Sequence, residues 1–194
     1  MYSVEDIPGR VTSMYPALAG SVALPCRMLK VPFLARLPGE IGAGTTCDAM
    51  VSNVDFAPTF LDLAGVPIPS YMQGRSARGT IAGQVPGDLP KEAYHRYWMH
   101  KDESHNAFAH YGLRDHRYKL IYWYNDDLDQ PGAHPSVDEQ PEWELFDCEK
   151  DPLELFNVYD DPAYAEVRAE MTRKLDARML EIGDIPEHRP FGAQ

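Results

Sequence analysis

The sequence predicts an α+β fold in which a four-stranded antiparallel sheet packs on one long carboxy-terminal helix. Aromatic and β-branched runs alternate with turn residues between positions 93 and 147, and apolar residues recur at steps of three and four between positions 162 and 182. Because the apolar face of a sheet needs a partner, we expect the helix to cover it. With 194 residues, the chain is long enough to bury such a core.

Composition narrows the classes of function. The chain carries 18 Lys and Arg against 30 Asp and Glu, and the resulting net charge of −12 disfavours nucleic acid and anionic membrane surfaces as partners. Its longest apolar stretch is far shorter than the roughly 20 residues of a transmembrane helix. The first ten residues carry Glu5 and Asp6 and no lysine, so no secretory signal is predicted and the cytoplasm is the default compartment. Three widely spaced cysteines are expected to be reduced thiols, and the oligomeric state stays open.

The amino-terminal half predicts only pieces of a domain. Residues 1–28 show no helical or strand period, and we expect them to be poorly ordered. The apolar run 31–37, VPFLARL, predicts a buried strand, and the spacing of apolar residues over 52–65 predicts a helix with one buried face. One strand and one helix do not close a core, so this half looks incomplete. The Pro- and Gly-rich stretch 66–90 predicts a long surface connection and a subdomain boundary.

The carboxy-terminal half, 91–194, predicts a complete α+β unit. Its four strands are expected at 93–99, 108–113, 118–124 and 143–147, with a hairpin joining the middle two.

The long helix is expected over 162–182. Asp161 can cap its amino end, Pro162 suits its first position, and Gly183 follows its last turn. The acidic segment 125–139 lacks the regular spacing of a calcium-binding loop, so we interpret it as a solvated loop.

Histidines recur at steps of five along the predicted sheet. They are His95, His100, His105 and His110, and His116 follows. A step of five places successive side chains on opposite faces of a strand, so the rings can converge only across a turn. His105 lies in the predicted loop 102–106 and His110 lies in the strand after it, where they could bind an anionic substrate or a metal, or could lie free at the surface. For His100 and His116 we expect ordinary surface positions.

The aromatic residues of this half could form a platform for stacking sugars, but aromatic side chains on strands more often pack in cores and cross-strand pairs. We therefore expect such positions for Tyr94, Tyr97, Trp98, Tyr111, Tyr118, Tyr122, Trp123 and Tyr124. The chain has no G-x-S-x-G turn, no phosphate-binding glycine loop, no H-E-x-x-H helix and no paired metal carboxylates. By themselves, the residues do not specify a complete active site.

Several motifs occur in a fixed order along the chain. They are VPFLARLPG, SNVDFAPTFLDLAG, MQGRS, HYGLRDHRYKLI and WELFDCEKDPLELFN. Together they resemble the carboxy-terminal portion of the sulfatase family, within the alkaline phosphatase superfamily, in its arylsulfatase-like and N-sulfoglucosamine sulfohydrolase-like members. The resemblance implies that 29–90 is the last strand, helix and loop of an alkaline-phosphatase-like α/β domain. It also implies that 91–194 is the sulfatase carboxy-terminal α+β subdomain, whereas 1–28 resemble nothing in the family.

The family hydrolyses sulfate esters with a formylglycine made from the Cys or Ser of a C/S-x-P-x-R motif, beside a bound calcium ion. Cys26 lies in LPCRML, which lacks that motif, so the resemblance implies no catalytic residue and no metal ligand in this chain. Calcium and formylglycine are expected only in a complete family enzyme. His105 and His110 resemble the E-H-x-x-x-x-H-Y-G stretch near the active-site mouth, which implies that they hydrogen-bond a sulfated carbohydrate or an aryl sulfate.

Three hypotheses follow for the function. The first is a carboxy-terminal part of a sulfuric ester hydrolase that is inactive as this isolated chain, because the nucleophile and its metal are needed together. The second is a binding module without catalysis, which would bind a sulfated sugar or a partner chain. The third is a gene remnant that does not fold stably, since the strand at 31–37 would lack the sheet it joins.

Overall fold

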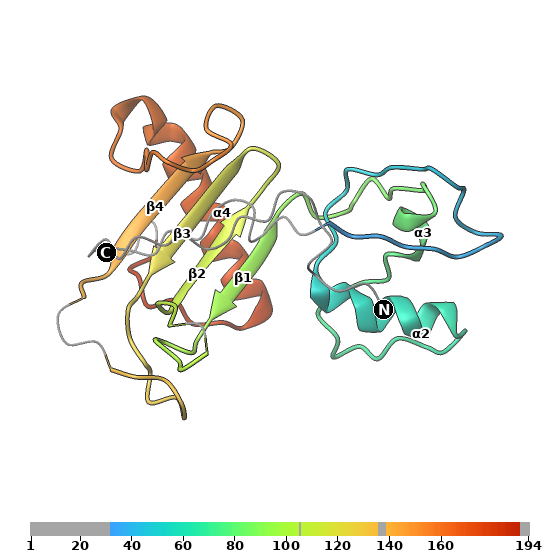
Figure 1. Cartoon of the computed structure of the whole chain (residues 1–194), viewed down its shortest axis with the longest axis horizontal. Coiled ribbons are helices and arrows are strands. Elements are labelled where there is room, and N and C mark those ends of the chain that lie inside the picture. The colour runs from blue at the N-terminus through green and yellow to red at the C-terminus, as the bar shows by residue number, and fades with distance from the viewer. Residues whose placement is uncertain (1–31, 105, 136–138, 191–194) are drawn as a thin grey trace.

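The computed structural model describes residues 32–104, 106–135 and 139–190. Figure 1 shows two regions side by side: residues 32–90, with two short helices, and residues 91–190, with the sheet and the long helix. The expectation for residues 1–28 lies outside the described part of the chain. Within that part, no helix combines the length and the apolar character required to cross a bilayer.

The predicted four-stranded antiparallel sheet is confirmed. Its strands are β1 Ala93–Tyr97, β2 His110–Arg114, β3 Tyr118–Trp123 and β4 Glu142–Asp147. They pair in chain order, each antiparallel to the next, and the β2–β3 connection is the short hairpin that the sequence predicts. The observed strand ends differ from the predicted ends by two residues at most.

The predicted carboxy-terminal helix is also confirmed. A single 3₁₀ turn, η3 Pro162–Tyr164, leads into α4 Ala165–Ile182. Asp161 caps this start by accepting a hydrogen bond from the Ala163 amide at 2.9 Å. Gly183 ends the helix at φ +72°, in the left-handed region that glycine adopts without strain.

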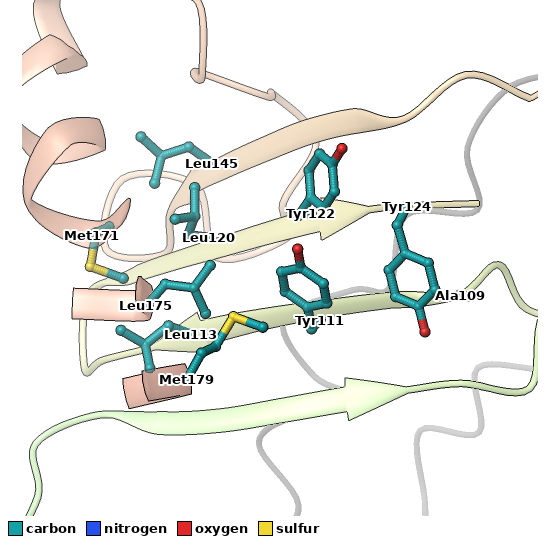
Figure 2. Close-up of a cluster of buried hydrophobic side chains, with 10 residues drawn as sticks. All are labelled: Ala109, Tyr111, Leu113, Leu120, Tyr122, Tyr124, Leu145, Met171, Leu175 and Met179. Carbon is teal, nitrogen blue, oxygen red and sulfur yellow. The ribbon is translucent and has the colours of Figure 1, made fainter. Parts of the chain in front are cut away.

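α4 lies across one face of the sheet and completes the main core. Met171, Leu175 and Met179 are at most 1% exposed and project toward the strands (Figures 1 and 2). The sheet side of this core consists of Ala109, Tyr111, Leu113, Leu120, Tyr122, Tyr124 and Leu145. Most of the aromatic residues thus occupy the expected core and cross-strand positions, whereas Trp98 is 48% exposed. The core forms because alternate residues of each strand point to one face of the sheet, where they pack against helix residues spaced by four.

The opposite face of the sheet holds a smaller apolar cluster together with buried charges. Ile121, Trp123 and Phe146 form the cluster. Beside them, Lys119 forms an ion pair with Glu154, and both side chains are 0% exposed. A buried pair of this kind is tolerated only when the two charges meet directly, as they do here.

The prediction of a buried strand over 31–37 is wrong for the described residues 32–37. They follow an irregular path with almost all side chains exposed, and Leu34 is 93% exposed. A strand is stable only when a neighbouring strand binds its backbone groups, and every strand in the described part of the chain belongs to β1–β4.

The helix predicted over 52–65 is confirmed in two pieces, η2 Asn53–Asp55 and α2 Phe56–Leu63. The Asp55 carboxylate accepts the Ser52 amide at 2.9 Å, which closes a capping box. The predicted buried apolar face is wrong, because Phe60 is 68% exposed and Pro58 and Thr59 are buried instead. The stretch after this helix is the predicted surface connection, interrupted by the short α3 Arg78–Ile81.

Candidate functional site

The connection between β1 and β2 is the site that the histidine pattern predicts. Two backbone hydrogen bonds span it, from Lys101 N to Ala107 O at 2.7 Å and from Asn106 N to Asp102 O at 2.8 Å. Lys101 and Asn106 both have positive φ, +51° and +47°, which non-glycine residues rarely adopt. We call residues 98–109 the β1–β2 loop. His105 belongs to this segment but lies outside the described residues.

Asp102 holds the middle of the β1–β2 loop. One of its carboxylate oxygens accepts the Ser104 amide at 2.7 Å, and the other accepts the Tyr97 hydroxyl. Burial, together with the nearby Asp102 charge, raises the pKa of Tyr97 to about 12, so the hydroxyl keeps its proton and remains a donor. A shallow depression next to this carboxylate is lined by Met99, Asp102, Glu103, Ser104, Gly132 and His134.

The expectation of a surface position for His100 is wrong, because its side chain is 0% exposed. Its Nδ1 accepts the Ala109 amide at 3.0 Å, and its carbonyl accepts the His134 amide at 2.8 Å. An amide N–H can only donate, so His100 is the neutral tautomer with its proton on Nε2. Burial lowers the pKa of His100 and favours this neutral form. The His100 ring is therefore a hydrogen-bond acceptor for the loop backbone, a role that the spacing of the histidines does not predict.

His110, the first residue of β2, is 3% exposed. Its Nδ1 donates to Phe108 O at 2.7 Å, and its ring lies between those of Trp123 and Tyr97, at centroid distances of 4.5 Å and 5.7 Å. Burial lowers the pKa of His110 to about 4, so the ring is neutral at pH 7. His110 is therefore a buried ring that contacts the loop backbone.

The sequence interpretation misses His95, which faces His110 at a centroid distance of 5.5 Å. The two rings share a face because Tyr97 pairs with His110 and His95 pairs with Gly112 in the antiparallel register. Burial lowers the pKa of His95 well below its ordinary range, and the described residues offer no hydrogen-bond partner for its Nε2. Knowing the hairpin register would have revealed this pair. His116, in the β2–β3 turn, is exposed as predicted.

Residues 32–90 contribute a second feature, an apolar groove of about 280 Å³. It is lined by Phe33, Leu34, Ala35, Arg36, Leu37, Ile41, Phe56, Thr59, Phe60, Leu63, Ala77 and Ile81. Phe33 stacks on Phe56 at 5.4 Å, yet both rings remain over a third exposed. An exposed apolar surface of this kind marks a place where another surface normally packs.

A calcium ion and a formylglycine do not fit the described residues. Among these residues, no group of three or more His, Cys, Asp or Glu side chains is arranged to hold a metal. Cys47 and Cys148 are followed in the sequence by DAMV and EKDP, so neither lies in a C-x-P-x-R motif. No step of a sulfatase reaction can therefore be assigned to these side chains.

A solved structure of the same architecture is that of BT4656 in complex with its substrate D-glucosamine-2-N,6-O-disulfate. It is 35% identical to this chain, with a TM-score of 0.66, and the match covers 82% of this chain and 29% of that one. A second, BT1596, a 2-O GAG sulfatase, is 26% identical with a TM-score of 0.51, over 67% of this chain and 25% of that one. The sheet and its covering helix thus place the described fold in the class of sulfatase structures.

The family follows from the sequence comparison. The model of the N-sulphoglucosamine sulphohydrolase C-terminal family matches residues 26–181, and the chain belongs to that family. The N-acetylglucosamine-6-O-sulfatase of Bacteroides thetaiotaomicron is 38% identical over 157 residues, which are 80% of this chain and 26% of that protein. Human arylsulfatase K is 33% identical over 160 residues, 81% of this chain and 26% of that protein. The chain therefore spans about a quarter of the length of these relatives.

Proposed function

We propose that the chain supplies the carboxy-terminal part of a sulfuric ester hydrolase and does not cleave sulfate esters by itself. The observation that carries this proposal is the family match over residues 26–181, which corresponds to only about a quarter of the relatives' length. Hydrolysis requires an activated nucleophile and charge stabilisation in one constellation. The described residues offer no metal cluster for that purpose.

In this proposal, residues 29–90 are the part of the chain that corresponds to the end of an alkaline-phosphatase-like α/β domain, with residues 32–37 irregular rather than a strand, and residues 91–194 are the carboxy-terminal subdomain. The apolar groove beside α2 supports the first assignment, because Phe60 and Leu34 would be buried once the rest of such a domain packed on them. The exposed path of 32–37 is then an edge segment without its sheet.

The proposed ligand is a sulfated carbohydrate, with a 6-O-sulfated glucosamine as the first candidate and an aryl sulfate as the second. The names of two similar proteins support this order: one is an N-acetylglucosamine-6-O-sulfatase, and the other was solved with D-glucosamine-2-N,6-O-disulfate. We assign the direct hydrogen bond to His105. His110 is 3% exposed and donates to Phe108 O, so it would contribute to ligand binding by supporting the loop backbone from its buried side.

Two measurements on the purified chain test the proposal. Glucosamine 6-O-sulfate and p-nitrophenyl sulfate should release no sulfate. In an NMR titration, glucosamine 6-O-sulfate should shift the imidazole signal of His105 and leave that of the exposed His116 unchanged. Unsulfated glucosamine and the His105→Ala variant serve as controls. Sulfate release by the chain alone, or equal shifts at His105 and His116, would contradict the proposal. Binding that is independent of the sulfate group would favour the binding-module hypothesis instead.

A further inference from the structure

We infer that His100 and His110 are positioning residues that hold the described parts of the β1–β2 loop, 98–104 and 106–109, in the shape that binds the ligand. The inference rests on the proposed function, which places this loop against the sulfated sugar. It assigns a use to two buried rings that sequence reasoning took for a surface residue and for a direct ligand contact. Both rings contact consecutive residues at the end of the loop rather than its outer surface.

The two imidazoles hold neighbouring backbone groups from opposite ends of the loop. His100 lies near its start and accepts the Ala109 amide at 3.0 Å, whereas His110 lies just past its end and donates to Phe108 O at 2.7 Å. The Ala109 carbonyl in turn accepts the Tyr124 amide at 3.2 Å, beyond the end of β3. The last loop residues are therefore fixed to both histidines and to the sheet.

The loop needs such support because its backbone is strained. Lys101 and Asn106 occupy the left-handed region, and a side chain there persists only when its surroundings hold it. The ladder from Lys101 to Ala107 and from Asn106 to Asp102 closes over the outer part of the loop. That ladder begins one residue after His100 and ends two residues before Ala109. Losing the hydrogen bond between Ala109 N and His100 Nδ1 would therefore release the base of the ladder.

The hydrogen-bond roles of the two rings are opposite, which makes the inference testable by substitution. His100 must present a lone pair at Nδ1, and His110 must present a proton there. An asparagine side chain places an oxygen or an N–H near the position of Nδ1, so it can replace either bond. A leucine fills similar space and can replace neither. If the rings acted through packing alone, the asparagine and leucine variants would have the same effect on the loop and on ligand binding.

The test compares His100→Leu and His100→Asn with His116→Leu, which changes an exposed histidine of the neighbouring turn. Amide hydrogen exchange at Ala109 reports the loop base, and an NMR titration with glucosamine 6-O-sulfate reports Kd. In His100→Leu we expect exchange at Ala109 to accelerate by about tenfold or more and Kd to rise by about tenfold. His100→Asn should stay within about threefold of the unsubstituted chain in both, and His116→Leu should change neither.

The outcomes separate the inference from the proposed function. If His100→Leu loses protection at Ala109 but binds the sugar with an unchanged Kd, the inference is wrong and the proposed function stands. If His100→Asn and His100→Leu weaken sugar binding equally, a positioning role through Nδ1 is overturned. Absence of binding by the unsubstituted chain would overturn the proposed function, and the inference with it. Should His100→Leu fail to fold, the pair His110→Leu and His110→Asn decides by the same criteria.

Discussion

Residues 91–190 bury a core of large apolar side chains, whereas residues 32–90 bury none. In the first region, the sheet and α4 cover one another, and Leu120, Leu145 and Leu175 are all 0% exposed. In the second, Phe60 and Leu34 are 68% and 93% exposed, and the buried residues are Pro58, Thr59, Ala77 and Thr80. The first region contains both partners of its core, whereas the second presents one partner of an interface. We therefore expect global stability to depend on the first region alone.

The strongest test of this comparison adds the same methyl group at a tight glycine in each region. A Cβ on Gly112, in β2, would collide with Leu120 O, and a Cβ on Gly74 would collide with Val54 O. Because Leu120 O belongs to β3, one of the two inner strands of the sheet, Gly112→Ala should cost about 4 kcal/mol of unfolding free energy or prevent folding. Gly74→Ala should leave the main transition within about 0.5 kcal/mol.

Urea denaturation followed by tryptophan fluorescence measures both variants, because Trp123 and Trp143 lie in the sheet. Amide exchange in α2 provides the local control, since Gly74→Ala should accelerate it there and not in β3. An equal loss of global stability in the two variants would mean that residues 32–90 unfold together with the sheet. A chain that shows no cooperative transition at all would support the gene-remnant hypothesis.

The second test removes apolar side chains of known exposure. Leu175→Ala empties a position in the centre of α4 that is 0% exposed, and it should cost about 3 kcal/mol through lost burial and the cavity left behind. Leu180→Ala on the same helix and Phe60→Ala on α2 are the matched controls, with 82% and 68% exposure, and each should change stability by less than about 0.5 kcal/mol. A large effect of Phe60→Ala would show that its groove is covered in solution.

These contrasts also explain what the sequence could predict. The caps Asp161 and Gly183 and the three-four spacing of α4 are local signals, and their covering partner lies in the same chain, so that helix was predictable to its ends. The run 31–37 carries an equally strong apolar signal, but its prediction as a buried strand assumed a neighbouring strand that the described residues do not contain. A periodic pattern identifies a surface that needs burial and does not reveal whether its partner is present.

The site was predictable to a lesser degree. The sequence singles out the β1–β2 loop and His110, which stay a prediction, but it misplaces His100 and gives His95 no role. The first depends on a hydrogen bond to Ala109, nine residues away, and the second depends on the strand register. The hydrogen bond and the register are both set by how the loop connects β1 to β2, and the five-residue spacing of the histidines predicts neither.

A third test uses acid to separate the regions. Burial lowers the pKa of His110 to about 4 from its ordinary value near 6.5, so the unfolded chain binds this proton more readily than the folded chain. Stability contributed by His110 is therefore complete above pH 6.5 and declines as the pH falls toward 4. The decline should reach about 3 kcal/mol by the lower limit, since each pKa unit is worth about 1.4 kcal/mol.

Urea denaturation at a series of pH values between 7 and 4 measures this slope. His110→Asn keeps the donor to Phe108 O and removes the titrating group, so its stability should fall less steeply than that of the unsubstituted chain. Identical slopes for His110→Asn and the unsubstituted chain would show that His110 does not govern the acid response of the sheet.

The smallest expected effect concerns the end of α4, where local geometry rather than packing decides the cost. Gly183 has φ +72°, and a Cβ there would meet nothing within 4 Å, so Gly183→Ala adds only backbone strain. It should cost about 1 kcal/mol in urea denaturation. Gly87→Ala is the matched control in residues 32–90, because a Cβ there also meets nothing and its φ lies outside the left-handed region. A neutral Gly183→Ala would mean that the helix end frays before the sheet unfolds, and the cooperative unit would then exclude the last turn of α4.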